Sequence, residues 1–350
     1  MVSNHESVAL TIRRLRSAGH TLKSVSIRLG YQIPNFSYGA PVRNLFPTVI
    51  AQAREAEDSG FDALFVMDHF YQLPGIGSPD QPMLEAYSTL SGLATATSRI
   101  QLSALVTGNI YRNPTLLAKA VTTLDVVSCG RAVLGIGAGW FELENRQLGF
   151  EFGTFSDRFD RLEEALSILG PMLRGERPTV EGKWYHTETA INEPRMRDDL
   201  PIMLGGSGEK KLFGLAARHA NHLNIICDPA ELPRKLEALE ARCQEAGRDR
   251  AEIETSFLAS VAIGADRDEA VDRVAEAMRA RGVNLDAIDP GRRRSMQSRL
   301  FAGTPEQVAA DIRKRVLEPG LDGVIVNIIA NGHVPGIVST VGSALKPLLR

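Results

Sequence analysis

The sequence predicts an α/β protein, namely a (β/α)8 barrel with inserted segments at its mouth. Eight short apolar runs rich in β-branched residues alternate with longer amphipathic stretches. Several runs are apolar at consecutive positions, which is typical of parallel strands covered on both faces. Since parallel neighbours need crossover connections, eight strands each followed by helical sequence indicate a closed barrel. A doubly wound open sheet is the alternative, and eight repeats over about 320 residues favour closure.

The elements follow one another along the chain in a regular order. The predicted strands are Val25–Ile33, Ala63–Met67, Ile100–Val106, Ala132–Ile136, Pro201–Leu204, Leu223–Ile226, Ile253–Ile263 and Gly323–Ile328. Prolines in the first helical turn, N-cap residues and glycine caps mark the ends of several predicted helices. These helices are Pro47–Ser59 with Gly60 as its cap, Pro114 to about Cys129, Ser156–Arg174, and one with Thr304 as N-cap and Pro305 at its first position.

Three segments stand apart from this repeat. Residues 1–24 are predicted to be a separate extension, disordered or helical, before a single barrel domain of residues 25–350. Gly175–Leu200 lacks a helical period and is predicted to form a hairpin and loop over the barrel mouth. Gly282–Gly303 is a second irregular segment, and its Arg292–Arg294 run is interpreted first as a solvated face. Either insertion is a candidate lid.

Composition excludes several classes of protein. Forty basic and 42 acidic residues give a net charge of −2, so nothing in the overall charge favours nucleic acid or an anionic membrane. The three cysteines share no C-x-x-C spacing, which fits a reducing compartment. No apolar run is long enough to span a bilayer, and no secretory leader is recognisable. We therefore expect a cytoplasmic protein that acts on a small molecule.

In a barrel, function is expected at the C-terminal ends of the strands. Gly205–Gly208 follows a predicted strand and precedes a helix, where unpaired backbone N–H groups favour phosphate. The hydroxyl of Ser207 and a charge from Lys210 or Lys211 would add to such a site. The spacing Gly135-x-Gly137-x-Gly139 has two interpretations, namely close approach of a flat ring system or tight packing at the barrel rim.

Asp68 and His69 form the most reactive-looking pair, at the end of the second predicted strand. A histidine there is a candidate acid–base group, whereas elsewhere a lone histidine is more often a buried structural one. His219 and His222 lack a third ligand at usable spacing, so no metal site is predicted. The absence of G-x-S-x-G removes support for a serine hydrolase.

From about Val25 to the C-terminus, the sequence resembles the luciferase-like flavin and deazaflavin oxidoreductases. The similarity is carried by Gly60–Phe70, Asn113–Lys119, Thr123–Arg131, Leu134–Trp140 and Gly205–Gly208. The family fold is a (β/α)8 barrel, in agreement with the strand count. The forms Met67–Phe70 and Gly137–Trp140 are most similar to the actinobacterial branch that uses coenzyme F420.

This resemblance implies an F420-dependent oxidoreductase that transfers a hydride between the deazaflavin and an unidentified small organic substrate. His69 is then the catalytic acid–base residue, with Asp68 in contact with the deazaflavin. The other cofactor contacts that the resemblance implies are Thr107, Ala138, Gly139, Glu144, Arg158, Gly205, Gly206, Ser207, Gly208 and Glu209. It also implies a homodimer, and a non-prolyl cis peptide bond near Ala104-Leu105.

The sequence departs from the family pattern at several positions. The glucose-6-phosphate dehydrogenase branch has a catalytic glutamate where this chain has Trp140, although Glu142 and Glu144 lie nearby. The alternative cofactor is FMN, in a monooxygenase that uses O2 and reduced flavin. Asn145 and Leu148 depart from that branch, whereas Glu144, Arg158 and Ser207 match it. A third hypothesis is a non-catalytic barrel that carries or senses the cofactor.

Overall fold

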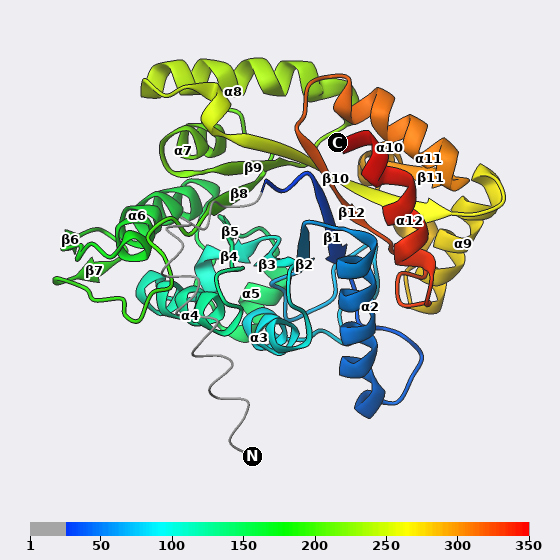
Figure 1. Ribbon diagram of the computed structural model, residues 1–350, viewed down its shortest axis with the longest axis horizontal. Helices are drawn as coiled ribbons and strands as arrows, with labels where there is room; N and C mark the ends of the chain where they lie inside the picture. The colour runs from blue at the N-terminus through cyan, green and yellow to red at the C-terminus, as the bar shows by residue number, and fades with distance from the viewer. Residues whose placement is uncertain (1–25, 350) are drawn as a thin grey trace, which may run out of the picture.

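The computed structural model describes residues 26–349 and shows a closed ring of eight parallel strands surrounded by helices (Figure 1). The predicted extension of residues 1–24, together with Val25, lies outside the described residues. The ring strands are β1 (Leu29–Ile33), β2 (Ala63–Val66), the third strand in two parts β3 (Gln101–Ala104) and β4 (Thr107–Gly108), β5 (Leu134–Gly137), β8 (Ile202–Gly206), β9 (His222–Ile225), β10 (Glu254–Ile263) and β12 (Gly323–Asn327).

The ring closes because β12 pairs in parallel with both β10 and β1, while the third strand joins β2 to β5. All eight strands fall within or next to the predicted runs, and the prediction of a (β/α)8 barrel is confirmed. Their consecutive apolar residues are buried, as in β2, because side chains fill the barrel interior on one face and helices cover the other.

The helices lie around this ring, and most follow a strand in the order that the sequence predicts. They are α2 (Leu45–Ser59), α3 (Ala86–Ala96), α4 (Pro114–Val127), α5 (Glu142–Leu148), α6 (Phe155–Arg174), α7 (Lys211–His219), α8 (Leu232–Ala246), α9 (Arg267–Ala280), α10 (Pro290–Ser298), α11 (Pro305–Ile312) and α12 (Ile337–Leu345). Short 3-10 turns are η1 (Val42–Asn44), η2 (Asn109–Tyr111), η3 (Pro229–Glu231), η4 (Arg250–Glu252), η5 (Leu285–Ala287) and η7 (Lys346–Leu349), and η6 (Arg313–Leu317) is a π-helical turn.

Helix ends follow the expected local chemistry. Gly60 adopts φ 83° and caps α2, which begins two residues before Pro47. Thr304 and Gln307 form a reciprocal capping box at the start of α11, with Pro305 at its first position.

The predicted hairpin in Gly175–Leu200 is present, as β6 (Val180–Glu181) and β7 (His186–Thr187), but its predicted position over the barrel mouth is wrong. The segment connects a helix to the following strand, so it has to return to the amino-terminal end of the ring. It packs outside α6, where the Glu164 carboxylate accepts hydrogen bonds from Lys183 N at 3.0 Å and Trp184 N at 2.8 Å. Figure 1 shows the hairpin beside α6, at the edge of the molecule.

The sequence suggested that the segment Gly282–Gly303 is irregular, but this prediction is wrong. The segment contains η5, α10 and a further strand, β11 (Leu300–Gly303). Strand β11 pairs in parallel with the end of β10, outside the ring. With α9, this insertion follows the C-terminal end of β10 and covers one side of the barrel mouth. Periodicity missed α10 because its sequence is polar almost throughout.

Glycines near the end of β5 make room for the neighbouring strand. An added Cβ would lie 2.0 Å from Ala104 O at Gly135, 2.8 Å from Val106 Cγ2 at Gly137 and 2.7 Å from Ile110 Cδ1 at Gly139. Of the two interpretations of this glycine spacing, the structure therefore supports tight packing at the rim. Gly205 in β8 plays the same part, since its Cβ would lie 2.7 Å from Val106 Cγ1.

The third strand is interrupted at Leu105-Val106, whose peptide bond is cis. The family resemblance implied a cis bond near Ala104-Leu105, one bond earlier. Two buried side-chain amides inside the barrel hold this segment in place. Gln32 Nε2 donates to Leu105 O at 3.1 Å, and Asn327 Nδ2 donates to Gln32 Oε1 at 3.2 Å.

We predict that Gly135→Ala destabilises the fold by at least about 3 kcal/mol, because the new methyl group would meet a backbone carbonyl that cannot move aside cheaply. Gly214→Ala in α7 is the matched control, because its new Cβ has no neighbour within 4 Å and alanine favours the helix. Chemical denaturation followed by circular dichroism measures both. Equal midpoints for the two variants would contradict this account of the glycine.

Candidate active site

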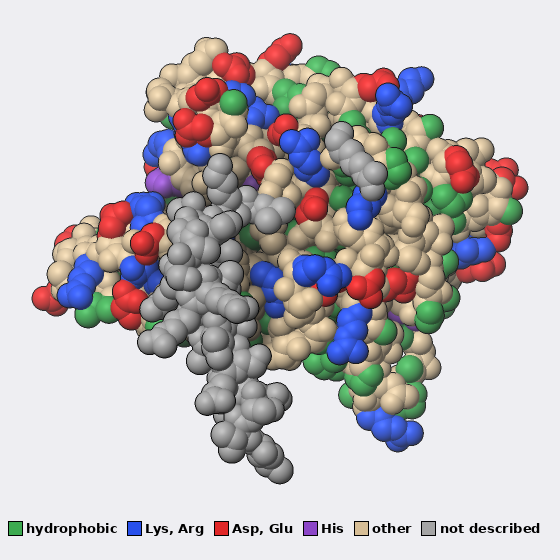
Figure 2. All heavy atoms as spheres, in the orientation of Figure 1, with side chains coloured by type: hydrophobic (Ala, Val, Ile, Leu, Met, Phe, Trp, Pro, Cys, Tyr) green, Lys and Arg blue, Asp and Glu red, His purple; other side chains and the backbone are tan. Residues whose placement is uncertain are grey.

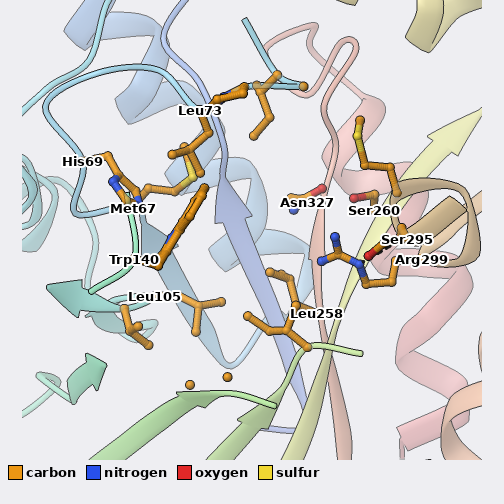
Figure 3. A pocket seen from close by; sticks show the side chains of 18 of the residues that line it. Met67, His69, Leu73, Leu105, Trp140, Leu258, Ser260, Ser295, Arg299 and Asn327 are labelled. Atoms are coloured by element: carbon orange, nitrogen blue, oxygen red, sulfur yellow. Dashed lines mark hydrogen bonds between the residues drawn. The ribbon is translucent and has the colours of Figure 1, made fainter. Parts of the chain in front are cut away.

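A cavity of about 810 Å3 opens at the C-terminal ends of the ring strands (Figure 3). Ten of the sequence-predicted site residues line it, nine of them at or just after the ends of four strands and one on helix α6. These residues are Asp68, His69, Thr107, Ala138, Gly139, Arg158, Gly205, Gly206, Ser207 and Gly208. Glu144 and Glu209 are not among the residues that line it, and their contact with a cofactor stays a prediction.

Glu144 lies behind His69 and is completely buried. The Nδ1–H of His69 donates to Glu144 Oε2 at 2.9 Å, because an ionised carboxylate only accepts hydrogen bonds. Tyr111 Oη donates to the same oxygen at 2.5 Å, and the backbone N–H groups of Phe70 and Tyr71 donate to Oε1. With Nδ1 engaged, the other ring nitrogen, Nε2, is left for a group in the cavity.

These donors also decide the charge of Glu144. Burial alone raises the pKa of a carboxyl group, but the hydrogen bonds from His69, Tyr111 and the backbone of Phe70 outweigh burial and lower the pKa of Glu144. Glu144 is therefore ionised at neutral pH. The sequence predicted Glu144 as a cofactor contact, but it gave no signal that Tyr111 would donate a hydrogen bond to Glu144.

Asp68 is buried and fully paired. Arg112 Nη1 and Nη2 donate to its two carboxylate oxygens at 2.6 Å and 2.9 Å, and Gly108 N donates to Oδ2 at 3.0 Å. Arg112 also reaches Glu85 at 2.6 Å. Asp68 therefore fixes the end of the third strand, and its charge is balanced by an arginine that sequence reasoning missed.

Thr107 is buried and shares a hydrogen bond of 2.7 Å with the hydroxyl of Tyr87 on α3. Burial raises the pKa of Tyr87, so its phenol stays protonated at neutral pH and fixes the Thr107 hydroxyl. Tyr87 is a further residue that the sequence gave no reason to select.

The cavity lining also includes hydrogen-bond donors that have no protein acceptor. Among residues 26–349, no protein group accepts from the backbone N–H of Ser207 or Gly208. Arg158 donates to Gly139 O and Gly153 O, each at 3.1 Å, and within the described chain no carboxylate lies within ion-pair distance of it. Unpaired amides beside an arginine suit a phosphate group.

Glu209 points away from these donors. It pairs with Lys235 Nζ at 2.7 Å and Arg234 Nη1 at 3.1 Å, and the hydrogen bond from Lys235 lowers the pKa of Glu209. Lys211 pairs with Asp160 at 3.1 Å, and neither Lys210 nor Lys211 lines the cavity. The predicted help from these lysines to an anion site therefore has no support in the structure.

Trp140 stands at the cavity wall next to His69, with 51% of its surface exposed. Its ring stacks on Phe141 at a centroid distance of 5.4 Å and meets His69 edge-on at 5.9 Å. Glu142 is exposed and lies outside the cavity lining. Among the described lining residues, Asp68 is the only carboxylate, so neither nearby glutamate replaces the acid that Trp140 displaces.

A comparison with known families decides the class of protein. A family model described as luciferase-like monooxygenase matches residues 27–323. The chain belongs to this family. The resemblance stated from the sequence and the prediction of an oxidoreductase are thereby confirmed.

Individual relatives are also similar over most of the chain. An F420-dependent glucose-6-phosphate dehydrogenase of Microbacterium testaceum is 31% identical over 256 residues, which cover 71% of this chain and 72% of the relative. An F420-dependent hydroxymycolic acid dehydrogenase of Mycobacterium tuberculosis is 29% identical over 246 residues, covering 69% and 66%. The solved F420-dependent secondary alcohol dehydrogenase is 22% identical, with a TM-score of 0.76 over 93% of this chain and 100% of that one, and it supports the fold.

Within residues 26–349, no helix is long and apolar enough to cross a bilayer. The single-domain division, the homodimer and the cytoplasmic location stay predictions.

We predict that Glu144→Gln lowers the free energy of unfolding by about 2 kcal/mol at pH 7, because a charged acceptor of four donors is lost. The pKa of Glu144 is lowered on folding, so this stabilisation is complete above its ordinary value of about 4.5. It disappears as the pH falls through the lowered pKa of the folded state.

Denaturant unfolding at pH 7 and at steps down to pH 3 measures the difference in free energy of unfolding between the native chain and Glu144→Gln. Glu142→Gln is the control, because Glu142 is an exposed carboxylate two residues away. We expect this difference to become smaller at acidic pH for Glu144→Gln, and to stay near zero at every pH for Glu142→Gln. A difference in free energy of unfolding that became larger on acidification would show that the buried carboxyl group of Glu144 is not held ionised.

Proposed function

We propose that this protein is a coenzyme F420-dependent oxidoreductase, which moves a hydride between the deazaflavin and a carbon that carries an alcohol or carbonyl oxygen. The observation that carries this proposal is that the His69–Glu144 pair stands at the wall of a cavity that Arg158 and the unpaired amides of Ser207 and Gly208 also line. A group that exchanges protons thus faces the same space as a set of donors for a phosphate.

The residues present suit such a cofactor. Thr107 and the Ala138-Gly139 backbone form one wall for a ring system, and the donors at Ser207, Gly208 and Arg158 suit its phosphate. FMN would place similar demands on this wall and on the phosphate end. The choice of F420 is supported by the relatives named as F420-dependent, and by Asn145 and Leu148, which depart from the FMN branch.

When bound, coenzyme F420 would supply a carbon that accepts or donates a hydride. His69 Nε2 would take the proton from the substrate hydroxyl as its carbon is oxidised, and would return it in the reverse direction. Glu144 would hold the ring in place and stabilise the imidazolium that forms. Asp68 is neutralised by Arg112, so we assign it a positioning part rather than a proton-transfer part.

The sugar-phosphate reaction named for the Microbacterium relative is not part of this proposal. The resemblance places a catalytic glutamate of that branch at the position of Trp140, and no second carboxylate of the described chain faces the cavity. We therefore propose the same type of reaction, hydride transfer with F420, on a substrate other than a sugar phosphate.

The proposal is tested by fluorescence titration of the apo-protein with F420 and with FMN at matched ionic strength. We expect micromolar or tighter binding of F420 and much weaker binding of FMN. The reverse preference would favour the FMN-dependent monooxygenase and would call for oxygen-uptake assays. Arg158→Ala should weaken F420 binding about 10- to 100-fold through the lost charged contact. Arg294→Ala removes an arginine outside the cavity and should have no effect.

We predict that His69→Ala retains F420 affinity within a few-fold but loses at least about 100-fold in turnover, because the proton-transfer group is removed while the phosphate end stays intact. Binding is measured by the same titration, and turnover by the F420 absorbance change with an alcohol that the native enzyme oxidises. Unchanged turnover would remove His69 from the reaction. Binding without turnover of any alcohol or ketone by the native enzyme would support a carrier or sensor instead.

A further inference from the structure

The lining of the cavity extends well beyond the residues assigned to the cofactor. Figure 3 shows His69 and Trp140 on one side, and Ser260, Ser295 and Arg299 across the cavity from them. The far side is built largely by the insertion after β10, which includes α9, η5 and α10. This second half of the cavity has no part in the proposed cofactor site.

Beside these polar residues, the far side has a continuous apolar part. Its lining includes side chains of α9, η5 and α10 and of the loop between the last two, namely Val271, Val274, Met278, Leu285, Ile288 and Met296. Val271 is 37% exposed although it has no polar atom in its side chain, and Leu285, Ile288 and Met296 are only partly covered. We call this set the apolar wall. Partly exposed aliphatic side chains around a cavity suit the hydrophobic part of a ligand.

The rim of the same insertion is positively charged. Arg292 and Arg293 are exposed residues that line the cavity, and each donates to a backbone carbonyl, of Pro74 and of Leu285 respectively. In the described chain, no carboxylate lies within ion-pair distance of either arginine. The adjacent Arg294 does not line the cavity. The run is a solvated face, as the sequence suggested, but two of its members also border the cavity.

We infer that the substrate is an amphipathic molecule with a long apolar body and an anionic end. The apolar body packs against the apolar wall, the anionic end meets Arg292 and Arg293, and the reacting alcohol or ketone carbon lies near His69. This inference rests on the proposed function for the redox step. In that step, the alcohol carbon loses a hydride to the cofactor and its hydroxyl loses a proton to His69, so that a ketone is formed.

The redox test uses the full chain loaded with F420 and a series of secondary alcohols, from 2-propanol through 2-octanol to 2-dodecanol, with 11-hydroxydodecanoate as the anionic member. The matching ketones are tested with reduced F420. We expect kcat/KM to rise about three- to fourfold for each added methylene until the wall is covered. A carboxylate at the far end should add about tenfold or more. A preference for 2-propanol, or no dependence on chain length, would overturn the inference.

A second measurement is independent of the cofactor. Binding of decanoate and of 2-decanol to the apo-protein is followed by calorimetry, so failure of F420 to bind and failure of the apolar wall to bind are separate results. We expect decanoate to bind at least about tenfold more tightly than 2-decanol. If neither probe binds, the inference is wrong even where F420 binds well.

Variants identify the surface that is used. Leu285→Asn with Ile288→Asn should weaken both probes at least about tenfold, whereas Ile191→Asn, at an exposed isoleucine outside the cavity, should weaken neither. Arg292→Gln with Arg293→Gln should weaken decanoate and spare 2-decanol, while Arg294→Gln leaves both unchanged. Thermal unfolding confirms that each variant is folded. Native-like binding of both probes by the two double variants would overturn the inference.

Discussion

The buried carboxylate of Glu144 is the contact on which the proposed reaction centre depends. Removing a charge from water costs several kcal/mol unless hydrogen bonds replace the lost hydration, and here four donors replace it. Those donors come from the loop after β2 and from η2, while Glu144 itself lies on α5. One side chain thus joins three connections at the barrel mouth. The hydrogen bond from His69 Nδ1 to this carboxylate holds the imidazole ring in its observed direction.

A second constraint shapes the opposite face of the same centre. Val106 occupies the space that side chains at Gly137 and Gly205 would fill, so the third strand lies unusually close to its neighbours. The interruption at this point places Thr107 against Tyr87 and brings the backbone N–H of Gly108 to Asp68. The glycines therefore serve the protein's own packing, and the flat wall offered to a ring system is a consequence of that packing.

The sequence predicted what depends on local periodicity and on strand order. Consecutive apolar residues located the ring strands, and the rule that strand ends carry function brought His69 and the Gly205–Gly208 turn into one cavity. Contacts between distant segments lay beyond such reasoning. Arg112 pairs with an aspartate 44 residues away, and nothing local distinguishes it from other arginines. The insertion Gly282–Gly303 was predicted, but its helix α10 was missed, since a polar helix held by neighbours has no apolar period of its own.

The division of the cavity between ring and insertion separates the proposed reaction centre from the surface that would select the substrate. His69, Glu144 and Asp68 belong to connections after β2 and β5, within the closed ring. The apolar wall belongs to an insertion whose own strand, β11, pairs outside that ring with the end of β10. Changes in the insertion therefore need not disturb the eight-strand closure or the hydrogen bonds of Glu144. The apolar wall and Trp140, which stands where the resemblance places a glutamate of the sugar-phosphate branch, then both favour an apolar substrate, while the proposed proton-transfer group keeps its place in the ring.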